Sequence, residues 1–159
     1  DLEVIEFSSP SIHATFSDFD LKLPNSKINT DRIFAGQKFS CSTSDSRKAS
    51  LYSESDSLEV LETPIDMASG SVGWVNEICG RKESDKQFAP LSPRIKGQPS
   101  FLLWFVKKGF AEIQIAERTE VVSAGDAISY PYGFNSSLEF SLLKHDADFE
   151  VLEVGFYGE

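Results

Sequence analysis

Short apolar runs separated by polar turns dominate the second half of the chain. Residues 101–106 (Phe-Leu-Leu-Trp-Phe-Val) are apolar throughout, which predicts a central strand covered on both faces. Residues 110–115 alternate and place Ala111, Ile113 and Ile115 on one face. Strands of about six residues joined by short turns predict an antiparallel sandwich or jelly roll. The remaining predicted strands cover residues 72–79, 120–122, 127–130, 138–143 and 149–154.

The first half of the chain has a less regular pattern. Residues 2–7 predict a first strand, and residues 13–16 predict a second, shorter one. The segment 40–57 is rich in serine, and its alternation fits either a polar strand face or a solvated surface loop. We favour the loop. Residues 58–62 fit either a strand that restarts the regular order or a short helical turn.

Length and composition favour one domain with a substantial core. The chain has 159 residues, and its 13 Phe, 2 Trp and 4 Tyr supply large, rigid apolar surfaces. A net charge of −10 makes it a poor partner for nucleic acid or anionic lipid, so we expect no direct nucleic-acid binding. No apolar run approaches the ~20 residues of a membrane span, and the sequence contains no basic-then-apolar leader. We therefore expect a cytoplasmic protein without membrane contact. Because the sequence begins with Asp1, it fits a processed or trimmed chain whose leader or neighbouring domain is missing.

Cysteine and histidine are scarce. Cys41 and Cys79 are too few for a disulfide framework, and we expect them to be buried free thiols. With only His13 and His145 besides them, a zinc site lacks ligands. His145 falls in a predicted turn, where we expect it to be solvated. We assign the acidic residues of 146–153, Glu153 among them, to that turn and to a solvent-facing strand surface.

A glycine-proline pattern in the stretch 125–136 is the most specific motif. Gly125 is followed after five residues by Pro131, and then by Gly133. Glycine permits a tight turn, and proline ends a short strand because it lacks a backbone donor. This spacing resembles the second signature of the cupin superfamily, which continues with two more residues and then a metal-binding histidine. Ser136 stands at that histidine position.

The first cupin signature gives a matching result. When its closing glycine is placed at Gly109, its glutamate position falls on Leu102 and its two histidine positions fall on Lys96 and Gln98. None of these side chains, nor Ser136, is a usual ligand for a divalent metal. The resemblance therefore implies a cupin-like barrel with no metal and no cofactor.

The resemblance also implies where a ligand would bind. Leu102 at the inward-facing position places Trp104 and Val106 on the same face, and Ser136 would face the same volume. Aromatic walls with a few polar groups suit a neutral or anionic small molecule, with Lys96 as its charge partner. Complete filling of the interior by the same aromatic side chains is the alternative. The predicted ligand-binding residues are Trp74, Asn76, Lys96, Gln98, Trp104, Ser136 and Phe140.

The sequence thus predicts an all-β, cupin-like jelly roll or double-stranded β-helix barrel at residues 58–159. We expect residues 1–57 to form an N-terminal extension that packs on this barrel. The predicted function is metal-independent binding of a small organic ligand, similar to the sensor domains of arabinose-type regulators, in a homodimer. Two alternatives stay open, a metal-free isomerase, epimerase or lyase acting on a sugar or small acid, and a structural barrel without a ligand. No catalytic residue is assigned.

Overall fold

A computed structural model describes most of the predicted barrel and parts of the segment before it. The described residues are 4–8, 31–34, 36–47, 49–51, 55–84, 99–115, 117–130 and 140–157. Most of them lie in strands, and every strand pair that they form is antiparallel. The all-β fold predicted from the alternating pattern is therefore confirmed.

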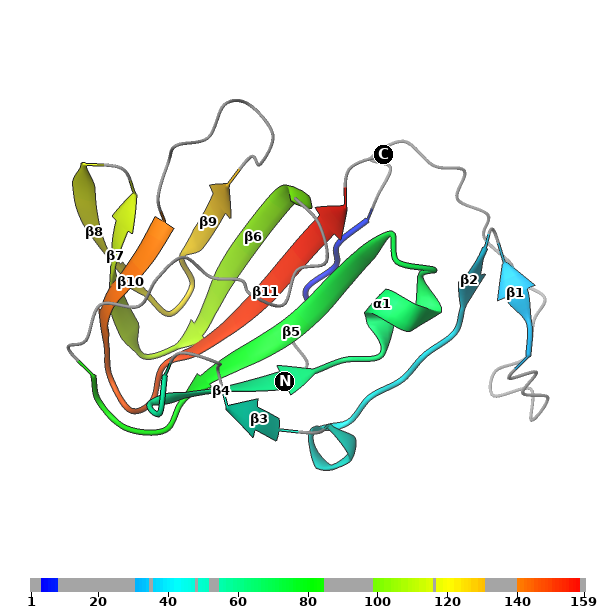
Figure 1. Cartoon of the computed structure of the whole chain (residues 1–159), viewed down its shortest axis with the longest axis horizontal. Helices are drawn as coiled ribbons and strands as arrows, with labels where there is room; N and C mark the ends of the chain where they lie inside the picture. The colour runs from blue at the N-terminus through cyan, green and yellow to red at the C-terminus, as the bar shows by residue number, and fades with distance from the viewer. Residues whose placement is uncertain are drawn as a thin grey trace.

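The larger sheet forms the body of the molecule (Figure 1). The long strands β5, β11 and β6 lie side by side at its centre, and the chain reaches β11 last. The order of its six strands is β3 (Ala49–Leu51), β4 (Leu58–Glu62), β5 (Gly73–Gly80), β11 (Glu150–Tyr157), β6 (Pro99–Lys108) and β9 (Ala127–Tyr130).

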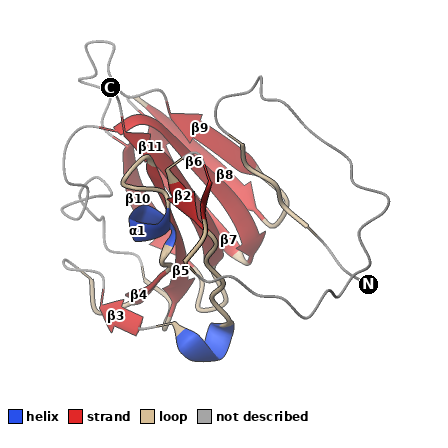
Figure 2. Cartoon of the chain, turned by 90° about the vertical axis from the view of Figure 1, so that its right-hand side faces the viewer, coloured by secondary structure: helices blue, strands red, loops and turns tan. Residues whose placement is uncertain are grey.

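A smaller sheet lies beside β9 and β6 in Figure 1, and Figure 2 gives the view from the side. Its three strands follow the order β10 (Phe140–His145), β7 (Phe110–Ile115) and β8 (Arg118–Ser123). The described part of the chain has three further elements. They are the strand pair β1 (Ile33–Phe34) and β2 (Gln37–Lys38), the helical turn α1 (Ile65–Ala68) and the 3₁₀ turn Ser44–Ser46.

The hydrophobic core lies between the two sheets. The predicted inward face of β6 is confirmed, because Leu102, Trp104 and Val106 are each 2% exposed or less. The smaller sheet contributes Ala111 and Ile113, which are fully buried as their alternation predicted. One apolar cluster thus joins side chains from both sheets, which holds them as a sandwich.

Two glycines shape the turns around β6. Gly109, between β6 and β7, has a φ of +69°, and Gly125, before β9, has a φ of +97°. Both values lie in the left-handed region that glycine adopts without strain. The Gly125 amide donates to the carbonyl of Val106 at 2.9 Å, which ties this turn to β6. Pro131, Gly133 and the end of the second signature lie outside the described residues.

The predictions for the first half have mixed outcomes. Residues 4–8 form no strand, although 2–7 predicted one. Residues 58–62 form a strand rather than a helical turn, because they pair along β5. The serine-rich segment holds a 3₁₀ turn and the short strand β3, so it is neither one long strand nor loop alone. The predicted strand 13–16 lies outside the described residues.

The division into an extension (1–57) and a barrel (58–159) stays a prediction. Within the extension, β3 pairs with β4 and continues the larger sheet. Arg47 also forms an ion pair with Glu77 of β5. These contacts agree with an extension that packs on the barrel. Among the described residues, no helix has the length and apolar character that crossing a membrane requires.

Candidate functional site

A buried carboxylate lies at the centre of the inner face of the larger sheet. Glu153, in β11, is 6% exposed and accepts three hydrogen bonds from side chains of the neighbouring strands. Its Oε1 accepts from Trp74 Nε1 at 3.2 Å and from Asn76 Nδ2 at 3.4 Å. Its Oε2 accepts from Trp104 Nε1 at 3.2 Å. We call these four residues the Glu153 cluster.

Strand register explains why the cluster forms. Glu153 pairs with Asn76 of β5 on one side and with Trp104 of β6 on the other. Directly opposed residues on adjacent strands point to the same face, so the three side chains share the inner face. Trp74 lies two residues before Asn76 and reaches the same carboxylate from the next row.

A glycine makes room for Trp74. Gly155 is the direct partner of Trp74 across β11 and β5. A Cβ at position 155 would lie 2.0 Å from the Trp74 indole ring, so the ring rests against bare backbone. The ring also contacts Tyr157, whose ring centroid lies 4.8 Å from its own. The position of the Trp74 donor therefore depends on the absence of a side chain at Gly155.

Burial dominates the electrostatics of the cluster. Desolvation raises the pKa of Glu153 above its ordinary value, and the hydrogen bonds from Trp104, Trp74 and Asn76 oppose this increase only in part. All three donors are neutral groups. A carboxyl group with a raised pKa keeps its proton to a higher pH than an ordinary glutamate does.

The seven predicted site residues have different outcomes. Three of them, Trp74, Asn76 and Trp104, lie on one inner face, and the structure brings all three onto Glu153. Three others, Lys96, Gln98 and Ser136, lie outside the described residues. Phe140 begins β10, and its side chain also lies outside the described part. Whether any of the seven contacts a ligand stays a prediction.

The sequence predicted that Glu153 lies on a solvent-facing strand surface, and this prediction is wrong. The strand surface that carries Val151 and Gly155 also carries Glu153, and that surface faces the core. Alternation did not separate the two faces of this strand, because Phe149 and Val151 on one face and Leu152 and Val154 on the other are all apolar.

The predicted solvent exposure of His145 is also wrong. It is fully buried, although its place in a predicted turn suggested solvation. Its Nε2 lies 2.9 Å from Ser57 Oγ, and its Nδ1 lies 2.9 Å from the carbonyl of Asp146. Ser55 Oγ continues the chain at 2.8 Å from Ser57 Oγ. These bonds join the start of β4 to the end of β10, which is a structural role.

The cysteines are free, as expected, but neither is fully buried, so the predicted burial is wrong. Cys41 is exposed and Cys79 is intermediate. Burial raises the pKa of the Cys79 thiol to about 11, and the nearby carboxylates of Glu77 and Glu150 add to the increase. Cys79 is therefore a thiol at neutral pH and a poor nucleophile.

The residues described here do not fit the metal site of the superfamily. Leu102, which the resemblance places at the glutamate position, is 2% exposed and carries no donor atom. In the described ranges, no three His, Cys, Asp or Glu residues gather closely enough to hold a metal ion. Because Lys96, Gln98 and Ser136 lie outside those ranges, metal independence stays a prediction.

Comparisons with known proteins identify the fold. Comparison with protein-family models and with curated proteins found no match. Among solved structures, an RmlC-like cupin from Shewanella frigidimarina aligns with a TM-score of 0.53 at 10% identity, over 77% of this chain and 95% of that one. The polyketide cyclase RemF from Streptomyces resistomycificus aligns with a TM-score of 0.53 at 17% identity, over 76% and 80%.

A third structure, KdgF from Halomonas sp., has a TM-score of 0.50 at 11% identity and covers 74% of this chain and 94% of its own. Identities this low establish architecture and not activity. The strand order, the sandwiched core and these alignments agree with the fold implied by the glycine-proline pattern. The chain has an all-β fold of the cupin type.

Proposed function

We propose that this protein is a metal-independent, cupin-like domain that binds a small organic ligand at the inner face of its larger sheet. The observation that carries the proposal is the Glu153 cluster. Three residues selected from the sequence as ligand contacts, Trp74, Asn76 and Trp104, meet on one buried carboxylate. Small-ligand sites commonly combine apolar and aromatic walls with a few polar groups that orient the ligand.

The cluster has the chemistry to orient a ligand. A carboxylate offers about four lone-pair positions, and the cluster fills three of them. Asn76 is only partly buried, so it is the member of the cluster through which a ligand would approach. A hydroxyl or amino group that donates to the remaining position of Glu153 would complete its hydrogen bonding.

A metabolite screen by thermal shift tests this proposal. A ligand should raise the unfolding temperature of the wild-type protein progressively with concentration, as mass action requires. Glu153→Gln and Asn76→Ala should remove the shift and remain folded. The matched control is Glu120→Gln, which removes the same charge from an exposed position on β8 and should keep the shift. A hit that survives both cluster substitutions would contradict the proposed site.

An enzymatic role is the second candidate, because Glu153 supplies the general base that a metal-free isomerase, epimerase or lyase requires. Its pKa is raised above the ordinary value, which makes the carboxylate a stronger base than that of an exposed glutamate. We expect such an enzyme to exchange a carbon-bound hydrogen of a sugar or small acid for deuterium in heavy water. NMR would detect the exchange, which Glu153→Gln should abolish. Absence of exchange across a panel of sugars and sugar acids would count against catalysis.

The remaining features of the proposal rest on the cupin resemblance. We propose a sensor or regulatory role, a homodimer, a cytoplasmic location and no direct nucleic-acid binding. Sedimentation equilibrium would measure the oligomeric state, and a monomer at micromolar concentration would contradict the homodimer. If no compound in the screen stabilises the protein, the structural barrel without a ligand becomes the better account.

A further inference from the structure

Two glutamates are buried on adjacent strands of the larger sheet, and they differ in how their charge is compensated. Glu77 of β5 is 7% exposed and Glu153 of β11 is 6% exposed. Their side chains point to opposite faces, because Asn76 is the direct partner of Glu153 and Glu77 follows it by one residue. The sheet thus carries one buried carboxylate on each side.

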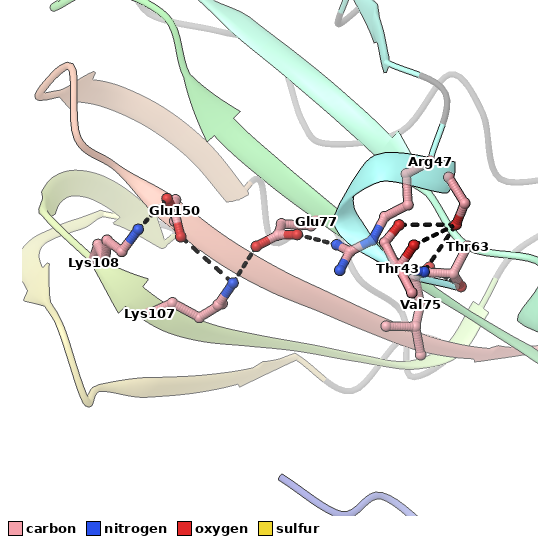
Figure 3. A network of polar contacts seen from close by, with 9 residues as sticks. Thr43, Arg47, Thr63, Val75, Glu77, Lys107, Lys108 and Glu150 are labelled. Atoms are coloured by element: carbon pink, nitrogen blue, oxygen red, sulfur yellow. Dashed lines mark hydrogen bonds and ion pairs between the residues drawn. The ribbon is translucent and has the colours of Figure 1, made fainter. Parts of the chain in front are cut away.

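Glu77 lies within a network of charges (Figure 3). Arg47 and Lys107 form ion pairs with its two carboxylate oxygens. Lys107 also reaches Glu150 at 3.5 Å, and Lys108 contacts Glu150 at 2.6 Å. Desolvation raises the pKa of Glu77, but the hydrogen bonds and charges of Lys107 and Arg47 outweigh it, so the pKa lies below its ordinary value.

Glu153 has no such compensation within the described part of the chain. Its three partners there are neutral, and its pKa is raised because desolvation outweighs their hydrogen bonds, with no ion pair to a described cation. Buried carboxylates in proteins are normally paired with a cation. An opposite charge within about 4–6 Å would restore the ionised form, as Arg47 and Lys107 do for Glu77.

The surroundings of the cluster are also acidic. Burial raises the pKa of Tyr157, and the carboxylate of Asp66 in α1 adds to this increase. The Tyr157 ring lies against the Trp74 ring in a tilted arrangement. Glu62 of β4 is the direct partner of Asn76 on the other side of β5. The whole chain carries a net charge of −10. A field of this sign attracts cations and repels anions.

We propose that the ligand of the Glu153 cluster is a small organic cation, whose ammonium group pairs with Glu153. The inference rests on the proposed ligand-binding function and specifies its ligand class. It differs from the neutral or anionic ligand expected from the sequence, because that expectation treated Lys96 as the charged group of the site and did not include Glu153. The ammonium hydrogen takes the lone-pair position that the three neutral donors leave open.

A charge series on one scaffold tests the ligand class. Cyclohexylamine, cyclohexanol and cyclohexanecarboxylate share a ring and differ in charge, and glucosamine with glucose gives a second, polar pair. Each compound is titrated into the wild-type protein at about 150 mM salt, where long-range attraction is screened. In at least one series we expect the cationic member to bind at least about ten-fold more tightly than its neutral counterpart.

Variants separate the site from general attraction to an acidic surface. Glu153→Gln should abolish the preference for the cation, whereas Glu120→Gln, which loses the same charge from an exposed strand, should keep it. Persistence of the preference in Glu153→Gln would overturn the inference. If Glu153→Gln does not fold, the charge series on the wild-type protein alone tests the inference, and equal binding of cationic and neutral compounds would overturn it.

Failure of the cation inference can be distinguished from failure of the proposed ligand-binding function. If neutral or anionic compounds bind as tightly as amines and depend on Glu153, the cation inference is overturned and ligand binding at the cluster stands. If neither the charge series nor the metabolite screen yields a compound that depends on Glu153, both the inference and the proposed function are overturned.

Discussion

At the scale of single residues, Trp104 joins the core to the candidate site. Its side chain is 1% exposed, its indole donates to Glu153, and its ring lies 6.3 Å from that of Phe149. Trp104→Ala should therefore lower the free energy of unfolding by about 3–5 kcal/mol, through lost burial and the cavity that remains. Urea denaturation would measure the loss. An unchanged midpoint with an unchanged slope would contradict the packing described here.

Glu153 should make stability depend on pH in an unusual direction. Its pKa is raised above the ordinary 4.5, so the native state keeps a proton that the unfolded chain has released. The free energy of unfolding should therefore fall as pH rises from about 4.5 through the raised pKa. In Glu153→Gln this fall should be absent. Denaturation at several pH values would measure it, and parallel profiles for the two proteins would contradict the assignment.

The two cysteines should differ in reactivity. Cys41 is exposed, whereas the Cys79 thiol has a pKa of about 11. An ordinary thiol with a pKa of about 8.5 is partly ionised at pH 8, so Cys79 should alkylate on the order of 100-fold more slowly than such a thiol. Mass spectrometry after timed iodoacetamide treatment would follow both sites. Equal rates at Cys41 and Cys79 would mean that Cys79 is less buried than the structure shows.

At the scale of elements, β11 is the strand on which the site depends, because it pairs with β5 on one side and β6 on the other. Gly155 is its critical position. In Gly155→Ala the added Cβ would overlap the Trp74 indole, so the ring must move and its bond to Glu153 should break. We expect a loss of about 1–3 kcal/mol and a displaced Trp74 indole NMR signal.

A second glycine provides the control for this prediction. Nothing lies within 4 Å of a Cβ built at Gly125, but its φ of +97° strains any other residue. Gly125→Ala should therefore destabilise the protein and leave both indole signals in place. If Gly125→Ala moves the Trp74 signal as much as Gly155→Ala does, the effect is general and does not arise from contact with the ring.

The sequence predicted some of these elements and missed others. The strands from β5 onward were predictable because their apolar runs and short turns are local signals, as in residues 101–106 of β6. The irregular backbone of residues 4–8 could not be predicted, because an apolar pattern does not show whether a segment has a neighbouring strand to pair with. Burial of Glu153 depends on partners 49 to 79 residues away, which no local pattern reveals.

At the scale of the whole molecule, the sandwich gives its two faces different electrostatics. Arg47, Lys107 and Lys108 neutralise the outer face of the larger sheet around Glu77 and Glu150. The inner face keeps the carboxylate of Glu153 with neutral donors only, within the described residues. This asymmetry is the basis of the proposal that an organic cation binds inside.

The central claim is that a small organic ligand binds at the Glu153 cluster, and the two indole N–H groups test it most directly. The chain has only 2 tryptophans, and both donate to Glu153. Nitrogen-proton correlation NMR therefore gives two indole signals that both report on the site. During titration with a compound that stabilises the protein, both signals should move together and saturate at the same concentration. A stabilising compound that leaves both signals unmoved would contradict the claim.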